Sequence, residues 1–109
     1  MTTFDERERA FEKKFSIDQD LKFRIAARAN RHLGQWAADK LGLRGAAADA
    51  YIKELVHADL VHGSRALDKL ERDFQSKGIP FSHGELLTIM ADLQRVAARE
   101  IREADEKSV

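Results

Sequence analysis

The chain contains no cysteine, a single proline and no long apolar segment, and each absence excludes a class of protein. Without cysteine there is no disulfide, no thiolate zinc site and no redox dithiol, a composition that suits a reducing compartment. No segment approaches the 18 consecutive apolar residues of a membrane-spanning helix, and the amino terminus is too charged for a secretory signal. The sequence therefore predicts a cytoplasmic protein without direct membrane insertion.

The charged residues give no net charge, because 19 lysine and arginine side chains balance 19 aspartate and glutamate side chains. A neutral chain supplies no overall field that would attract nucleic acid or anionic lipid, so we expect neither as a partner. The neutrality is a cancellation between segments, since residues 21–44 contain six basic side chains and one acidic side chain, a net charge of +5. That basic segment is available to an acidic neighbour or to a phosphate group.

Motifs of catalysis and metal binding are also missing. The chain has no glycine-rich phosphate loop, no Gly-x-Ser-x-Gly elbow and no His-Glu-x-x-His sequence. The four histidines are His32, His57, His62 and His83. His57 and His62 are five residues apart, a spacing that does not present both imidazoles to one ion on a straight helix, and no acidic residue completes a tight cluster. We therefore expect a protein that is not an enzyme, has no metal site and requires no cofactor.

The residues that are abundant favour helices throughout. Alanine, leucine, glutamate, lysine and arginine dominate, strand-like alternation is absent, and 43% hydrophobic residues suffice for one modest core in a chain of 109 residues. Glycine and proline mark turns near residues 42–45, 63–64 and 77–80. They separate four segments with apolar residues at three- and four-residue steps, at 18–41, 46–61, 64–77 and from 82 onward. Short connections between such segments predict an all-α, small four-helix bundle over residues 18–109.

Local signals specify the ends of two of these helices. Ser64 is placed as the N-cap of the third helix, and Gly78 as a left-handed residue after its end. The fourth helix has a capping box formed by Ser82 and Glu85, preceded by Phe81 at the position of a hydrophobic staple. These signals predict sharp boundaries for the third and fourth helices.

Residues 1–17 form a separate amino-terminal arm. Thr3 and Glu6 match a capping box, yet eight of the ten residues from 5 to 14 are charged and only Phe4, Phe11 and Phe15 form an apolar face. Burial of three phenylalanines contributes roughly 5–9 kcal/mol, while ordering about a dozen residues costs roughly 1–2 kcal/mol each. We therefore expect an arm that is conditionally helical or flexible, and a core helix able to begin afresh at Ser16 or Asp18.

Two interpretations of the arm and two of the basic segment follow from the pattern alone. The arm is either a segment that folds into a partner's groove or a charged helix end without a function. Arg24, Arg28 and Arg31 lie along one face of the first core helix. They either hold a phosphate group or an acidic partner, or pair with the acidic fourth helix.

Three motifs indicate a family. The chain begins MTTFDERERAFE at residues 1–12, and continues with RANRHLGQWAA at 28–38 and LGL at 41–43. These motifs resemble the zeta subunit family, the ATPase inhibitor of alphaproteobacterial F-type ATP synthases, and the similarity extends over the whole chain. The family's fold, as the resemblance implies, is a four-helix bundle.

The resemblance also implies an activity. The amino-terminal segment would insert at a catalytic interface between alpha and beta subunits, beside the gamma stalk, and block rotation in the direction of ATP hydrolysis. Carried over residue by residue, the inserted face would comprise Phe4, Asp5, Arg7, Glu8, Arg9, Phe11 and Glu12, to which the apolar pattern adds Phe15. The protein would be a monomer when free. When bound to the ATP synthase, it would be located at the cytoplasmic face of the inner membrane.

Two other functions stay open at this point. Some family members are thought to bind ATP or ADP weakly through the bundle, and for that role this chain offers Arg24, Arg28 and Arg31. The protein would then be an adenine-nucleotide-sensing bundle. Alternatively, it would be an assembly factor of the ATP synthase with little inhibition.

Overall fold

A computed structural model describes the backbone of residues 3–62 and 65–107, and the side chains of residues 18–59 and 65–107. Within these ranges the chain forms four α-helices and no strand: α1 (Thr3–Lys40), α2 (Ala46–His62), α3 (Ala66–Ser76) and α4 (His83–Lys107). The all-α prediction with four helices is confirmed, and α2 begins at the predicted residue.

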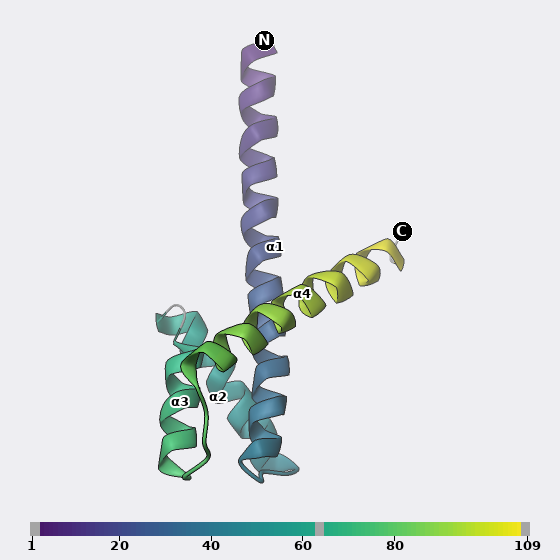
Figure 1. Ribbon diagram of the computed structural model, residues 1–109. Helices are drawn as coiled ribbons and strands as arrows, with labels where there is room; N and C mark the ends of the chain where they lie inside the picture. Colours follow the sequence, from purple (N-terminus) through teal and green to yellow (C-terminus); the bar gives the residue numbers. More distant parts are fainter. Residues whose placement is uncertain (1–2, 63–64, 108–109) are drawn as a thin grey trace.

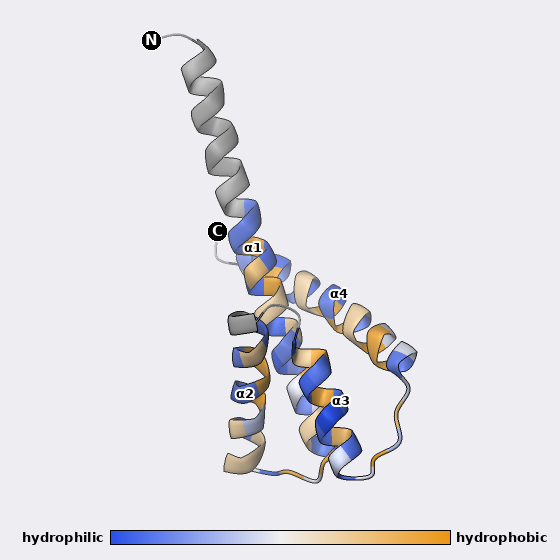
Figure 2. Cartoon of the chain, turned by 90° about the vertical axis from the view of Figure 1, so that its left-hand side faces the viewer, coloured by the Kyte–Doolittle hydropathy of each residue, from blue (hydrophilic) through white to orange (hydrophobic). Residues whose placement is uncertain are grey.

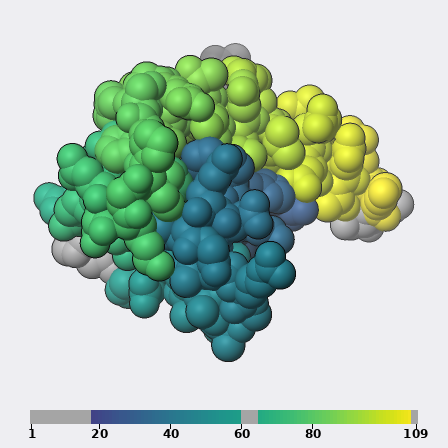
Figure 3. Space-filling model, turned by 60° about the horizontal axis from the view of Figure 1, so that its bottom comes forward, coloured from purple at the N-terminus to yellow at the C-terminus, as the bar shows by residue number. Residues whose placement is uncertain are grey.

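Helices α2, α3 and α4 are arranged around the carboxyl-terminal half of α1, as Figure 1 shows. Helices α2 and α4 both pack against α1, and α3 packs against α2. Helix α4 crosses α1 obliquely, and its end extends beyond the other helices (Figures 1 and 3). None of the helices in the described part of the chain is both long enough and apolar enough to cross a membrane.

Helix α1 is a single helix of 38 residues, which corresponds to roughly 57 Å. It passes through Ser16 and Asp18 without interruption, so neither residue caps a new helix. Its amino-terminal half extends past the ends of the other helices (Figure 1), which makes the molecule elongated, with dimensions of 64 × 28 × 24 Å.

The core lies where α1, α2, α3 and α4 meet. Its fully buried side chains include Leu33, Leu55, Leu70, Phe74 and Leu86, with at most 1% of each exposed. Figure 2 shows the strongest hydrophobic colour of α2 on the side toward α3, and its described buried side chains are Tyr51 and Leu55. The rings of Trp36 and Phe74 lie 5.8 Å apart between centroids, within the range of favourable aromatic contact.

Helices α1 and α2 approach closely at Gly34. A Cβ atom at this position would lie 3.1 Å from the Cα atom of Ile52, so any larger side chain would press on the backbone of α2. Small residues on the same part of α1, Ala29 and Ala37, are fully buried. The crossing of α1 and α2 therefore depends on the small size of these residues.

Local hydrogen bonds mark the end of α3 and the start of α4. Gly78 has φ +70° after α3, and the N–H of Ile79 donates to the carbonyl of Phe74 at 2.9 Å, as in a Schellman motif. At the start of α4 the backbone N–H of Glu85 donates to Ser82 Oγ at 3.1 Å, which confirms the predicted N-cap. Helix α3 differs from prediction, because Arg65 occupies its N-cap position without a side-chain hydrogen bond. Ser64 lies outside the described residues.

Candidate functional site

The residues predicted to bind a partner belong to the first half of α1. The backbone is helical from Thr3 onward, and the prediction that this arm is only conditionally helical stays a prediction. Positions 4, 11 and 15 are separated by seven and four residues, which places them along one side of a helix. The side chains of residues 1–17 lie outside the described residues, so these roles stay predictions: Phe4, Asp5, Arg7, Glu8, Arg9, Phe11, Glu12 and Phe15.

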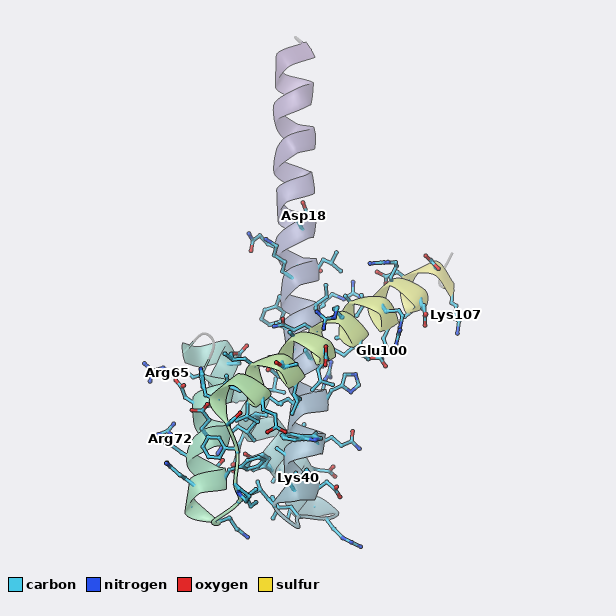
Figure 4. The ribbon with its side chains drawn as sticks, viewed as in Figure 1. Asp18, Lys40, Arg65, Arg72, Glu100 and Lys107 are labelled. Carbon is cyan, nitrogen blue, oxygen red and sulfur yellow. The ribbon has the colours of Figure 1, made fainter. Side chains whose placement is uncertain are left out.

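The base of this arm is fixed by polar contacts between α1 and α4. Arg24 contacts Asp105 at 3.2 Å, and Arg28 Nε donates to Glu100 Oε1 at 3.2 Å. His32 Nε2 lies 2.5 Å from the same oxygen of Glu100. Glu100 lies close to the point where α4 crosses α1 (Figure 4). Hydrogen bonds from Arg28 and His32 hold the pKa of the Glu100 carboxyl below its usual range. The interpretation that the basic face pairs with the fourth helix is confirmed for Arg24 and Arg28.

Arg31 has a different environment. It forms no ion pair with any described residue, and its exposed side chain lines a groove of about 440 Å³ between α1 and α2. Ile52 and Val56 form apolar parts of the groove, and charged or titratable side chains surround them: Asp49, Lys53 and His57. The structure therefore does not bring Arg24, Arg28 and Arg31 together at one phosphate-binding site. Arg24 and Arg28 pair with carboxylates of α4, whereas Arg31 lines the groove.

A second polar network joins α2 to α3. Tyr51 donates its hydroxyl hydrogen to Asp73 Oδ2 at 2.9 Å, and Lys69 contacts the same oxygen at 3.0 Å. Lys69 also lies 5.1 Å from the centre of the Tyr51 ring, in a cation–π arrangement. Burial, followed by the hydrogen bond to Asp73, raises the pKa of the Tyr51 hydroxyl far above its usual value. This network holds two helices together and leaves no free nucleophile or base.

The histidines are distributed over separate environments. His32 contacts Glu100, His83 contacts Glu71, and His57 lines the groove beside Arg31. His62 falls outside the residues whose side chains are described. No group of three or more histidine, aspartate or glutamate side chains that could hold a metal ion occurs in residues 18–59 and 65–107.

Sequence reasoning missed Asn30 as a candidate functional residue. It is only 2% exposed, and its Oδ1 atom has no hydrogen-bond partner among the residues that the structure describes. A signal was present in the sequence, because Asn30 lies between Ala29 and Leu33 on the apolar side of the helix, where a polar residue is unexpected.

These features define a class of protein: an all-α bundle from which the amino-terminal half of one long helix projects. The family model for ATPase inhibitor subunit zeta matches residues 1–100. The chain therefore belongs to the family of ATPase inhibitor zeta subunits, as its motifs suggested. Comparison with curated proteins and with solved structures gave no match.

Proposed function

We propose that this protein inhibits ATP hydrolysis by inserting residues 1–17 at a catalytic interface between an alpha and a beta subunit of the F-type ATPase. Contact with the gamma stalk then blocks rotation in the hydrolytic direction. The family supports an inhibitory role toward the ATP synthase; the inserted segment and its position are the proposal. The protein acts at the cytoplasmic face of the inner membrane and is a monomer when free.

The observation that carries the proposal is the projection of α1. Fifteen helical residues, 3–17, precede the bundle and measure roughly 22 Å, so the arm can enter a gap between subunits while the bundle stays outside. The bundle has its own buried core, and among the residues whose side chains the structure describes, the core residues lie at position 29 or beyond. Entry of the arm therefore requires no rearrangement of that core.

The sequence of the arm suits a protein interface. Its phenylalanines at positions 4, 11 and 15 recur on one side of a helix, and such widely spaced anchors are typical of helices that bind in grooves. Residues 5–14 contain four acidic and four basic side chains. A surface of mixed charge can pair with polar groups of either sign along a subunit interface.

A hydrolysis assay tests this proposal. Purified cognate ATPase is mixed with the full chain, with a version lacking residues 1–15, and with a version in which residues 3–17 are scrambled at constant composition. We expect inhibition by the full chain alone, because only it retains the order of anchors and charges. Equal hydrolysis with all three proteins at saturation would overturn the proposal. Helical content and melting temperature of each protein serve as the folding control.

The groove beside Arg31 favours a second candidate function, weak binding of ATP or ADP by the bundle. Arg31 and Lys53 supply positive charge, and Ile52 and Val56 supply an apolar surface for a base. Titration with ATP would then shift amide resonances near Arg31 and Lys53. Arg31→Ala would abolish the shifts and Arg24→Ala, whose side chain pairs with α4, would preserve them. Shifts that survive Arg31→Ala, or no localised shifts, would contradict this assignment.

A further inference from the structure

A groove opens between α1 and α4 at the base of the arm. Its volume is about 330 Å³, and its apolar lining comes from Leu21 and Ile25 of α1 and from Ala98 and Ile101 of α4. The two residues of each pair are three or four positions apart, so each pair lies on one side of its helix. The arm and the carboxyl-terminal end of α4 diverge from the point where the helices cross (Figure 1). The groove therefore lies in the angle between the arm and the end of α4.

Apolar surface is left uncovered in this groove. Leu21 keeps 37% of its surface exposed, and Ile25 and Ala98 are partly exposed. Ile101 is buried and forms the floor. Because removing apolar surface from water is the main favourable term in protein association, an apolar side chain from another protein would bind favourably here.

The groove faces nearly the same direction as the predicted anchors of the arm. Ile25 lies fourteen residues after position 11, which is two heptads and corresponds to a rotation of only about 40° around an α-helix. Helix α1 is continuous from Thr3 to Lys40, so this relation holds along its length. The distance between the two positions along the helix axis is about 21 Å. A partner segment that lies over position 11 therefore leads toward the groove.

The rim of the groove is charged, and its charges define the partner further. The carboxylate of Asp105 is paired with Arg24 at 3.2 Å. Arg102 and Glu106 also line the groove, are exposed, and form no ion pair with any described residue. They are four residues apart, so they lie on one side of α4. A complementary helix would carry an acidic and a basic residue at the same spacing, with an apolar residue between them.

We propose that the groove between α1 and α4 binds a helical segment of the ATPase catalytic sector while the arm is inserted. This inference rests on the proposed function, because it takes the ATPase as the partner. The segment places one large apolar side chain against Leu21, Ala98 and Ile101. Its basic and acidic residues pair with Glu106 and Arg102. The contact limits how far the arm enters, because the groove lies at a fixed distance from the anchors of the arm.

The first test measures the affinity of the full chain for the purified catalytic sector, with the melting temperature of each free variant as the folding control. Leu21→Ser should weaken binding about fivefold, because only the exposed third of the leucine can be newly buried. Ala98→Trp fills the groove and should weaken binding more. Leu87→Ser is the matched control and should bind like the wild type, because Leu87 is 49% exposed on α4 and does not line the groove. Unchanged affinity in both groove variants would overturn the proposal.

An exchange of charges tests the rim without altering the net charge. Arg102→Glu combined with Glu106→Arg should weaken binding about fivefold, the range expected for the loss of two exposed ion pairs. Arg99→Glu combined with Glu103→Arg is the control, because these residues are exposed on the same helix at the same spacing and do not line the groove. An equal loss in both exchanges would overturn the charged pairing at the groove.

Cross-linking identifies the occupant, because a chain without cysteine accepts a single reactive thiol. Ala98→Cys with a short photoreactive label should cross-link to a helix of the catalytic sector that has the predicted pattern. Leu87→Cys, roughly 16 Å away along α4, should not. Cross-links of Ala98→Cys only to a second copy of the chain, together with a dimer that Leu21→Ser dissociates, would indicate self-association and overturn the proposal.

The chain with a scrambled arm separates this inference from the proposed function. If that chain still inhibits fully, and Leu21→Ser weakens its binding, the groove stands while the role of the arm fails. If inhibition requires the native arm, and affinity is unaffected by Leu21→Ser, Ala98→Trp and the charge exchange, the groove fails and the proposed function stands.

Discussion

The two halves of α1 share one continuous helix but differ in what surrounds them. Residues 18–40 pack against α2 and α4 and contribute the fully buried Ala29, Leu33 and Ala37. Residues 3–17 extend past the other helices (Figure 1). Because α1 is continuous from Thr3 to Lys40, the packing of residues 18–40 in the bundle sets the direction in which residues 3–17 project.

The difference follows from where apolar residues are placed. In the second half they recur at every turn, so that burial offsets the entropy of ordering the chain. In the first half they occur at positions 4, 11 and 15, with charged residues dominating between them. Stability of the protein and its affinity for the ATPase should therefore respond to mutations in different halves of one helix.

The sharpest test of this separation compares a truncation in each half. Leu33→Ala should lower the free energy of unfolding by about 2–5 kcal/mol, because Leu33 is fully buried and its removal leaves a cavity. Phe11→Ala should change it by less than about 0.5 kcal/mol and should strongly weaken inhibition. Urea denaturation and the hydrolysis assay measure the two effects. A loss of several kcal/mol in Phe11→Ala would show that the arm belongs to the core.

A graded series at Ala10 tests whether the arm must be helical when bound. Glycine costs about 1 kcal/mol and proline about 3 kcal/mol relative to alanine in a helix. Inhibition should therefore weaken roughly fivefold in Ala10→Gly and about a hundredfold in Ala10→Pro. The melting temperature should stay the same in both, because position 10 precedes the bundle. Equal inhibition by all three proteins would mean that the bound arm is not a helix at this position.

Much of the fold could be predicted because its signals are local. Gly78 ends α3 with a left-handed residue and Ser82 caps α4, and each effect involves residues only a few positions apart. The apolar periodicity predicted for residues 18–41 is likewise confirmed, because Leu33 and Ala37, four residues apart on α1, are both fully buried. The start of α3 was predicted one residue early, since the N-cap position is occupied by Arg65, whose side chain makes no capping hydrogen bond.

The candidate site was predicted less completely, since its contacts join distant parts of the chain. The partner of Arg28 is Glu100, 72 residues away, and the pairing depends on the angle at which α4 crosses α1. Helical spacing alone grouped Arg31 with Arg28, although Arg31 lines a groove with α2. The significance of Asn30 also required the structure, because only burial distinguishes an unsatisfied amide from a solvated one.

A smaller effect is expected at the α2–α3 contact, which supports the bundle half. Tyr51→Phe removes the hydrogen bond to Asp73 and keeps the ring, so the free energy of unfolding should fall by about 1 kcal/mol. Because the pKa of Tyr51 is raised in the folded state, the wild type should lose stability as pH rises above the usual value of 10.0. Tyr51→Phe has no hydroxyl to titrate, so it does not lose this part of its stability at high pH. The free energies of unfolding of the wild type and the variant, measured as a function of pH, should therefore converge at high pH. Inhibition should be unchanged at neutral pH, and a parallel loss of inhibition would contradict the separation of the two halves.

The smallest effect is expected at Glu100, close to the boundary between the two halves. Its lowered pKa means that its pairing with Arg28 and His32 stabilises the fold above the ordinary carboxyl value of 4.5 and is lost as pH falls through the lowered pKa. Glu100→Gln should therefore be less stable than the wild type at neutral pH, and the difference should shrink in acid. Glu103→Gln is the matched control, because Glu103 is exposed on the same helix and forms no ion pair with a described residue. If Glu100→Gln also reduces inhibition while leaving the melting temperature unchanged, the α1–α4 contact orients the arm, and the two halves of α1 are coupled after all.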